Sequence, residues 1–268
     1  EWYARNRATV PTLRMLASEA LIERYDPNIV VDGTAPSFGA AVERRHARSL
    51  ALHDDLAVML STSGSPGAPK LVRLSRRNIE SDGGAIAEYL GLNADDRGIT
   101  SLPMHYCYGL SVLNAHLVAG ASVVVTDSSV VDPCFRSLAA EHAVTDLAGV
   151  PHTFELIEQS GADLLALDSL RLVTQAGGRM EPERVRRLAA RGAERGWALY
   201  VMYGQTEATA RMAYLPPALA LEFPDRVGVA IPGGSFEIRP VDDDRPAPGA
   251  PPGDLLGARK RCSGGVLR

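Results

Sequence analysis

The chain has 268 residues, 46% of them hydrophobic, and a formal net charge of −4 at pH 7. This length can bury a substantial core, so we expect one large α/β domain in preference to two small ones. The acidic balance argues against a nucleic-acid partner, which requires a basic stripe.

Cysteine usage and hydropathy predict a cytoplasmic protein. Cys107, Cys134 and Cys262 are odd in number and widely spaced, which fits neither a metal site nor a disulfide framework. No apolar run reaches the about 18 residues of a membrane span. The first residues also lack the apolar core of a signal peptide. We therefore expect a reducing compartment and no membrane span.

Apolar runs alternate with helical patterns along the chain, which predicts a largely parallel sheet covered by helices. Strands are expected, in chain order, at residues 28–31, 56–60, 121–125, 143–151, 170–174 and 197–202. Helices are expected at 75–90 and from residues 132 and 181 onward, where a proline suits the first turn. From Asp242 the composition turns to Asp, Pro and Gly, which predicts a turn-rich exit from the domain.

Residues 61–70 combine hydroxyls, glycines and one lysine directly after the strand expected at 56–60. Glycines let backbone N–H groups turn toward an anion, and hydroxyl and ammonium groups add donors, so this segment can hold a polyphosphate. A plain connector is the alternative interpretation. A Walker phosphate loop is disfavoured, because Leu71 follows Lys70 where that loop carries a hydroxyl for magnesium.

A second polar segment, residues 203–207, reads Tyr-Gly-Gln-Thr-Glu and follows the strand expected at 197–202. Its aromatic face, hydroxyl and carboxylate suit a base, a phosphate and a Mg²⁺ ion in turn. Between the two segments lie residues 102–110, which contain His105 and Tyr108, and the pair Gly177-Gly178. Taken alone, that histidine and tyrosine would be structural and the glycines an ordinary turn.

Together and in this order, the segments resemble the adenylate-forming (AMP-binding) superfamily of acyl-CoA and aryl-CoA synthetases, luciferases and the adenylation domains of peptide synthetases. The resemblance covers about residues 27–255. It rests on similarity to the family's phosphate loop, acyl-pocket segment, glycine pair, Y-G-x-T-E motif and G-x-x-x-P-G turn, at 61–70, 102–110, 175–180, 203–207 and 228–233. It implies an α/β fold of layered, mostly parallel sheets flanked by helices, as part of the large N-terminal domain.

The resemblance implies ATP-dependent activation of a carboxylic acid with Mg²⁺. The acid attacks the α-phosphorus of ATP, which gives an acyl-adenylate and pyrophosphate, so positioning and charge neutralisation should dominate. A complete enzyme would then transfer the acyl group to CoA or to a carrier-protein thiol. The β- and γ-phosphates are expected to contact Thr62, Ser63, Gly64, Ser65, Gly67 and Lys70.

The resemblance assigns the other roles to the later segments. Thr206 is expected to bind the α-phosphate and Glu207 the Mg²⁺ ion, and both are expected to be catalytic together with Lys70. Tyr203, next to Gly204, is expected to stack on adenine. The backbone of Gly177 and Gly178 approaches the base and the acyl group, and the acid pocket is expected to be lined by His105, Tyr108 and Gly109.

Two departures from the family pattern refine this expectation. Gly109 stands where peptide-synthetase adenylation domains have an aspartate that pairs with the amino group of the amino-acid substrate. A buried ammonium group would lack its counter-charge here, so we expect an acyl or aryl acid without an α-amino group. Pro66 replaces a hydroxyl of the phosphate loop and removes a donor.

The resemblance assigns residues 1–255 to a partial adenylation domain and 256–268 to a divergent tail, and it predicts that the small C-terminal lid domain is absent. Two main hypotheses remain open. The chain is a ligase core, or it is a non-catalytic remnant that retains nucleotide binding only. A phosphoryl-transfer NTPase is a weaker third. Pyrophosphate exchange that requires ATP and an acid, and that falls in Lys70→Ala or Glu207→Ala, would favour the ligase.

Overall fold

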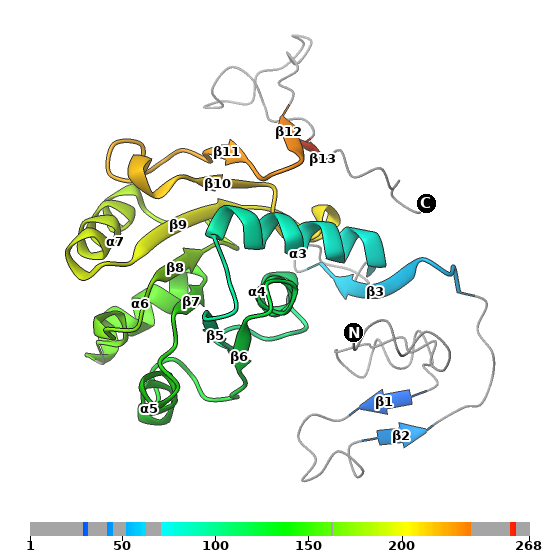
Figure 1. The fold of residues 1–268 in the computed structure, drawn as a ribbon, viewed down its shortest axis with the longest axis horizontal. Helices are drawn as coiled ribbons and strands as arrows, with labels where there is room; N and C mark the ends of the chain where they lie inside the picture. Colours follow the sequence, from blue (N-terminus) through cyan, green and yellow to red (C-terminus); the bar gives the residue numbers. More distant parts are fainter. Residues whose placement is uncertain are drawn as a thin grey trace. The chain divides into compact units, whose positions relative to one another are not determined.

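The computed structural model describes residues 29–31, 42–44, 52–62, 71–161, 163–236 and 258–260 (Figure 1). The chain divides into two compact units, residues 1–77 with 266–268 and residues 78–265. The division falls within the first turn of helix α3 (Arg76–Leu90).

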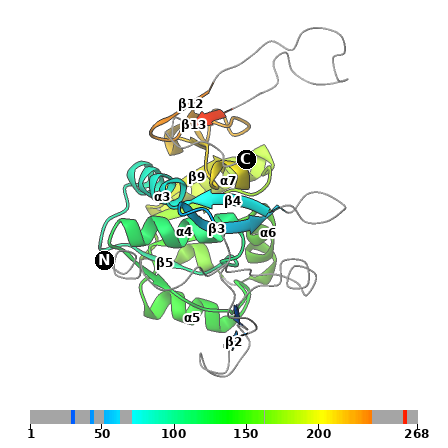
Figure 2. The ribbon, with the colours of Figure 1, turned by 90° about the vertical axis from the view of Figure 1, so that its right-hand side faces the viewer.

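The first unit contains two antiparallel strand pairs in its described part. Strand β1 (Ile29–Val31) pairs with β2 (Val42–Arg44). Strand β3 (Leu56–Ser61) pairs with β4 (Leu71–Ser75), and these two run side by side in Figure 2. The strands predicted at 28–31 and 56–60 are therefore confirmed.

The second unit is built on a seven-stranded sheet with the order β11-β10-β9-β8-β7-β5-β6. Five strands run parallel: β5 (Arg97–Ile99), β6 (Ser122–Val124), β7 (Asp146–Gly149), β8 (Leu172–Gln175) and β9 (Ala198–Tyr203). Strands β10 (Ala213–Leu215) and β11 (Val229–Ala230) continue the sheet in antiparallel fashion, and β12 (Gly234–Phe236) pairs separately with β13 (Ala258–Lys260). The predicted α/β fold with a mostly parallel sheet is confirmed.

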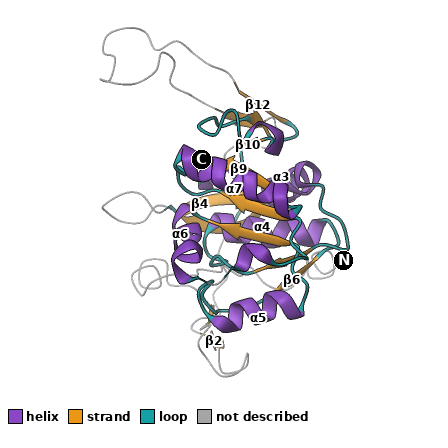
Figure 3. Ribbon diagram, turned by 90° about the vertical axis from the view of Figure 1, so that its left-hand side faces the viewer, coloured by secondary structure: helices purple, strands orange, loops and turns teal. Residues whose placement is uncertain are grey.

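Helices cover both faces of this sheet (Figure 1 and Figure 3). Helices α3 and α4 (Cys107–Val118) lie on one face, and α5 (Pro133–Glu141), α6 (Pro151–Ser160) and α7 (Pro182–Arg195) lie on the other. A proline opens each of the last three helices, where its missing N–H costs no hydrogen bond. Helices α6 and α7 end at glycines in the left-handed conformation. The helices predicted at 75–90 and from 132 and 181 are confirmed.

The largest difference between a predicted and an observed strand lies at β7. The strand expected at 143–151 is shorter, because β7 ends at Gly149 and Pro151 already opens α6. Among the helices of the described residues, none is both long and apolar enough to cross a bilayer.

The two faces of the sheet have different cores. On the α5–α7 face, buried Phe135, Phe154 and Trp197 pack among aliphatic side chains such as Val173 and Leu199. On the opposite face, here called the tyrosine face, α3 and α4 pack against the sheet through five tyrosines, Tyr89, Tyr106, Tyr108, Tyr200 and Tyr214. Successive residues of a strand point to opposite faces, so neighbours in β8 such as Leu172 and Val173 belong to different cores.

Candidate active site

The predicted binding segments of the second unit meet beyond the carboxyl ends of the parallel strands. The glycine pair follows β8, and residues 203–207 follow β9 into the short 3-10 turn η2 (Thr206–Ala208). The Thr206 hydroxyl donates a hydrogen bond to the Cys107 sulfur at the start of α4, with Oγ1 and Sγ 3.3 Å apart. This edge is where open α/β sheets bind their ligands.

The first residue of the glycine pair, Gly177, leaves no room for a side chain. Gly177 has a φ of 80°, which favours glycine. A Cβ on this residue would lie 2.3 Å from the Tyr106 hydroxyl oxygen and 3.1 Å from Cγ1 of Val150. The buried Gln175 side chain holds the turn, since its Nε2 donates to the Gly178 carbonyl at 2.8 Å. The exposed backbone at Gly177 and Gly178 is therefore fixed in place and open to a ligand.

The Tyr203–Glu207 segment folds tightly back on itself. A Cβ on Gly204 would lie 1.7 Å from the Ala210 carbonyl oxygen, and the N–H of Met212 donates to the Tyr203 carbonyl at 2.8 Å. Thr209 and Ala210 both have positive φ, at 59° and 77°. Such strain in residues other than glycine clusters at functional sites. The turn leaves the Tyr203 side chain 40% exposed, as a base-stacking surface requires.

The Glu207 carboxylate has the character expected of a magnesium ligand. Its side chain is exposed and, within the described residues, makes no hydrogen bond or ion pair. No group of three or more His, Cys, Asp or Glu side chains that could hold a metal occurs in the part of the chain that the structure describes. Mg²⁺ commonly uses one or two carboxylates together with substrate phosphates, so a single carboxylate fits this ion.

The three residues predicted to line the acid pocket have different surroundings. His105 is exposed ahead of α4. Tyr108 is buried, and its hydroxyl donates to Thr174 Oγ1 at 3.1 Å. Gly109 packs against the preceding loop, because a Cβ there would lie 2.3 Å from the Pro103 carbonyl oxygen. Gly109 also lines a pocket between α4 and β5. Tyr108 and Gly109 thus belong to the wall behind the site, and their assignment to acid binding stays a prediction.

Three side chains at this site carry no prediction from the sequence: Tyr106, Cys107 and Arg211. Burial raises the pKa of the Tyr106 hydroxyl and of the Cys107 thiol, so both groups are neutral at pH 7. The guanidinium carbon of Arg211 lies 4.4 Å from the centre of the Tyr108 ring. Tyr106 and Cys107 lie inside residues 102–110, which resemble the family's acyl-pocket segment, so their place in the sequence could have marked them as site residues. Nothing local distinguishes Arg211 from a surface arginine.

Most of the predicted phosphate loop cannot be placed. Thr62 follows β3 and is half-buried in the first unit. Five predicted residues lie outside the described part of the chain: Ser63, Gly64, Ser65, Gly67 and Lys70. Their role in holding the β- and γ-phosphates stays a prediction.

Comparison with known proteins identifies the class. A sequence model described as "AMP-binding enzyme" matches residues 7–263, which is most of the chain. The chain therefore belongs to the AMP-binding enzyme family, as the order of its segments predicts.

Several relatives are CoA ligases. The chain is 34% identical to indoleacetate–CoA ligase of Aromatoleum aromaticum over 197 aligned residues. The alignment covers 73% of this chain and 38% of that protein. The chain is 31% identical over 204 residues to medium-chain fatty-acid–CoA ligase of Escherichia coli, which covers 75% and 34% respectively. The chain thus spans little more than a third of these relatives.

Solved structures agree with the fold. O-succinylbenzoate CoA synthetase from Bacillus subtilis, in complex with ATP and magnesium ion, has a TM-score of 0.59 at 25% identity, over 76% of this chain and 42% of that one. The crystal structure of VinN has a TM-score of 0.60 at 26% identity, over 79% and 50%. ATP and Mg²⁺ are therefore ligands within this family.

Proposed function

We propose that this chain carries the nucleotide- and acid-binding part of an enzyme that activates a carboxylic acid with ATP, as an acyl-adenylate, and releases pyrophosphate. The observation that carries the proposal is the hydrogen bond from Thr206 to Cys107. It joins the end of β9, where nucleotide binding is expected, to the start of α4, where acid binding is expected. Family membership supports the same reaction.

Different residues are assigned to the adenine, the Mg²⁺ ion and the phosphates. The exposed ring of Tyr203 offers a stacking face to adenine, and the exposed backbone of Gly177 and Gly178 offers its polar groups to the nucleotide. Glu207 holds Mg²⁺, which when bound neutralises charge on the phosphates. Outside the described residues, the family resemblance assigns the outer phosphates to Lys70, Ser63 and Ser65, together with the described Thr62.

The Thr206 hydroxyl is poised to change partners. It now donates to the Cys107 sulfur, and sulfur is a weak acceptor. A charged phosphate oxygen is a much stronger acceptor, so exchange of the thiol for the α-phosphate is favourable. Because burial raises the pKa of the Cys107 thiol, the thiol is neutral and adds no negative charge beside the nucleotide after this exchange.

The finer aspects of the proposal follow from the relatives. We favour CoA over a carrier-protein thiol as the acceptor, because the curated relatives described above are CoA ligases. Their acids differ widely, so the acid itself is argued separately below. The cytoplasmic location predicted from cysteine usage stays a prediction.

A nucleotide titration with matched variants tests this function. We expect isothermal titration calorimetry to show that the chain binds a non-hydrolysable ATP analogue with Mg²⁺, and that Glu207→Ala weakens this binding about tenfold while Thr206→Val weakens it less. Glu222→Ala is the control, since Glu222 is equally exposed but lies away from the strand ends. Equal binding by Glu207→Ala and the control would contradict the assignment.

A non-catalytic remnant that retains nucleotide binding only is the alternative hypothesis, and pyrophosphate exchange distinguishes the two. The ligase catalyses exchange of labelled pyrophosphate into ATP that depends on an added acid. The remnant binds nucleotide but supports no exchange with any acid. A phosphoryl-transfer enzyme would instead release orthophosphate.

A further inference from the structure

Arg211 is a fully buried cation whose hydrogen bonds go to neutral groups. Its side chain is 1% exposed. Nη1 donates to the Tyr89 hydroxyl at 3.0 Å and to the Met202 sulfur at 2.6 Å. Nε has no hydrogen-bond partner among the residues that the structure describes. A buried charge is costly when its donors are not well satisfied.

The partners of Arg211 are weak for a guanidinium. A thioether is a poor acceptor, and the Met202 sulfur also accepts from the Tyr89 hydroxyl at 2.9 Å. The Tyr108 ring contributes a cation–π contact on the other side. Burial opposes the charged form of Arg211, but Tyr89, Tyr108 and the buried Asp82 carboxyl outweigh it and raise the pKa of the guanidinium. Planar guanidinium groups bind carboxylates through paired hydrogen bonds, and no acceptor of these hydrogen bonds from Arg211 is a carboxylate.

Arg211 lies next to the candidate active site. It follows the strained residues Thr209 and Ala210 at the end of the turn that carries Thr206 and Glu207. Its charge is felt at the start of α4, since burial raises the pKa of Cys107 and the Arg211 charge opposes that rise.

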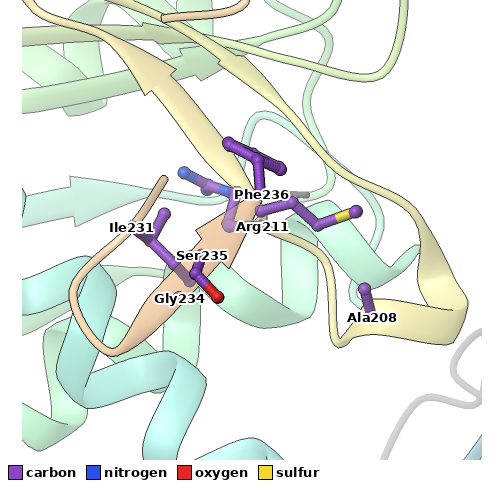
Figure 4. A pocket seen from close by; sticks show the side chains of 7 residues that line it. Ala208, Arg211, Ile231, Gly234, Ser235 and Phe236 are labelled. Atoms are coloured by element: carbon purple, nitrogen blue, oxygen red, sulfur yellow. The ribbon is translucent and has the colours of Figure 1, made fainter. Parts of the chain in front are cut away.

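A small pocket adjoins Arg211 (Figure 4). The pocket is small and partly open to solvent, and Ala208, the last residue of η2, forms one wall. Ile231 and Phe236 supply apolar surface, and Ser235 supplies a hydroxyl. The pocket is therefore lined by both apolar and polar residues, and Arg211 and Ser235 are its polar members.

We infer that Arg211 is a specificity-determining residue that binds a second carboxylate at the far end of the acid, so that the substrate is a short dicarboxylic acid. The inference rests on the proposed function. A distal carboxylate gives the buried guanidinium the charged acceptor that its neutral partners lack. An acid with a methyl end leaves those donors unsatisfied, and sites with buried polar groups reject such ligands strongly.

Matched acyl-adenylate analogues test the inference on the unmodified chain. The probes are 5′-O-(N-acylsulfamoyl)adenosines whose acyl groups have equal carbon number and end in a carboxylate or a methyl group: succinyl and butanoyl, glutaryl and pentanoyl, adipoyl and hexanoyl. We expect calorimetry to show that at least one carboxylate-ended analogue binds about tenfold or more tightly than its methyl-ended partner. Equal affinity within every pair overturns the inference and leaves the proposed function intact. Failure of all six analogues to bind overturns the inference, and it overturns the proposed function as well if the ATP analogue of the nucleotide titration also fails to bind.

A variant then assigns the selectivity to Arg211. We expect Arg211→Met to lower the affinity for the preferred carboxylate-ended analogue about tenfold and to change the affinity for its methyl-ended partner less than threefold. Arg226→Met is the control, because Arg226 is an exposed arginine of the same unit. Equal losses for both analogues in Arg211→Met would refute the assignment. If this variant does not fold, the comparison of analogue pairs on the unmodified chain still decides whether the acid carries a distal carboxylate.

Discussion

The carboxylate of Asp96 joins the amino ends of three parallel strands, and its replacement by asparagine tests how this edge of the sheet is held. Arg171 donates to it twice, from Nε at 2.9 Å and from Nη2 at 2.6 Å. The Asn93 N–H and the Thr145 hydroxyl donate at 2.9 and 3.0 Å. These donors come from the segments that precede β5, β7 and β8.

The magnitude of the loss follows from the burial of the two charges. The Asp96 side chain is 3% exposed and that of Arg171 is 41% exposed. Removal of one partner from a fully buried pair costs about 3–5 kcal/mol. Water solvates the half-exposed guanidinium after the change, so we expect Asp96→Asn to lower the free energy of unfolding by about 2–3 kcal/mol. The midpoint of thermal unfolding should fall by roughly 5–10 °C for a chain of this size.

The loss should also depend on pH. Burial alone would raise the pKa of Asp96, but the hydrogen bonds from Arg171, Asn93 and Thr145 lower it below its ordinary value. A carboxyl whose pKa is lower in the folded state stabilises the fold above its unfolded pKa of about 4. This stabilisation is lost as the pH falls through the folded pKa. The difference between the unmodified chain and Asp96→Asn should therefore be full at pH 7 and shrink below about pH 4.

Urea denaturation followed by circular dichroism at pH 7 and at pH 3.5 measures both effects. Asp95→Asn is the matched control, because Asp95 is the same residue type one position earlier and is exposed. A loss in Asp96→Asn that stays within about 0.5 kcal/mol of the control would refute the reasoning.

Three further predictions concern other parts of the second unit. Gly204→Ala should lower the free energy of unfolding by about 1–3 kcal/mol, because the new Cβ meets the Ala210 carbonyl; an unchanged denaturation midpoint would contradict this. Cys107 should react with iodoacetamide at pH 8 far more slowly than exposed Cys134, because burial raises its pKa, and equal labelling in peptide mass spectra would argue against the buried thiol. Phe135→Ala should cost about 3–5 kcal/mol in urea denaturation, since Phe135 is fully buried; a loss below about 1 kcal/mol would mean that the core closes over the cavity.

Four of the five parallel strands could be predicted from the sequence, because β6 to β9 lie in short apolar runs bounded by glycine, proline or charged residues. Strand β5 was missed, because its sequence Arg-Gly-Ile forms no such run. Helix α4 could not be predicted either. Its residues are apolar on nearly all sides, as in Val112 and Leu113, so the polar face that marks a surface helix is missing. Strands β10 and β11 were also missed, because two or three residues carry too little alternation to stand out.

The candidate site divides in the same way. Short local sequence segments were enough to predict binding roles for Gly177, Tyr203, Thr206 and Glu207. The place of Arg211 depends on contacts with Tyr89 in α3 and Tyr108 in α4, more than 100 residues earlier in the chain. Such a contact exists only after the sheet has formed, so no local pattern could have identified it.

The different cores on the two faces of the sheet separate two evolutionary pressures. Residues of the α5–α7 face, such as Phe135 and Val173, contribute to stability without contact with the candidate site. Arg211 and its tyrosine neighbours lie on the opposite face, which is the face that the inference about Arg211 assigns to acid recognition. On that inference, substitutions on the tyrosine face change which acid binds, while the core of the α5–α7 face supplies the stability that such substitutions reduce.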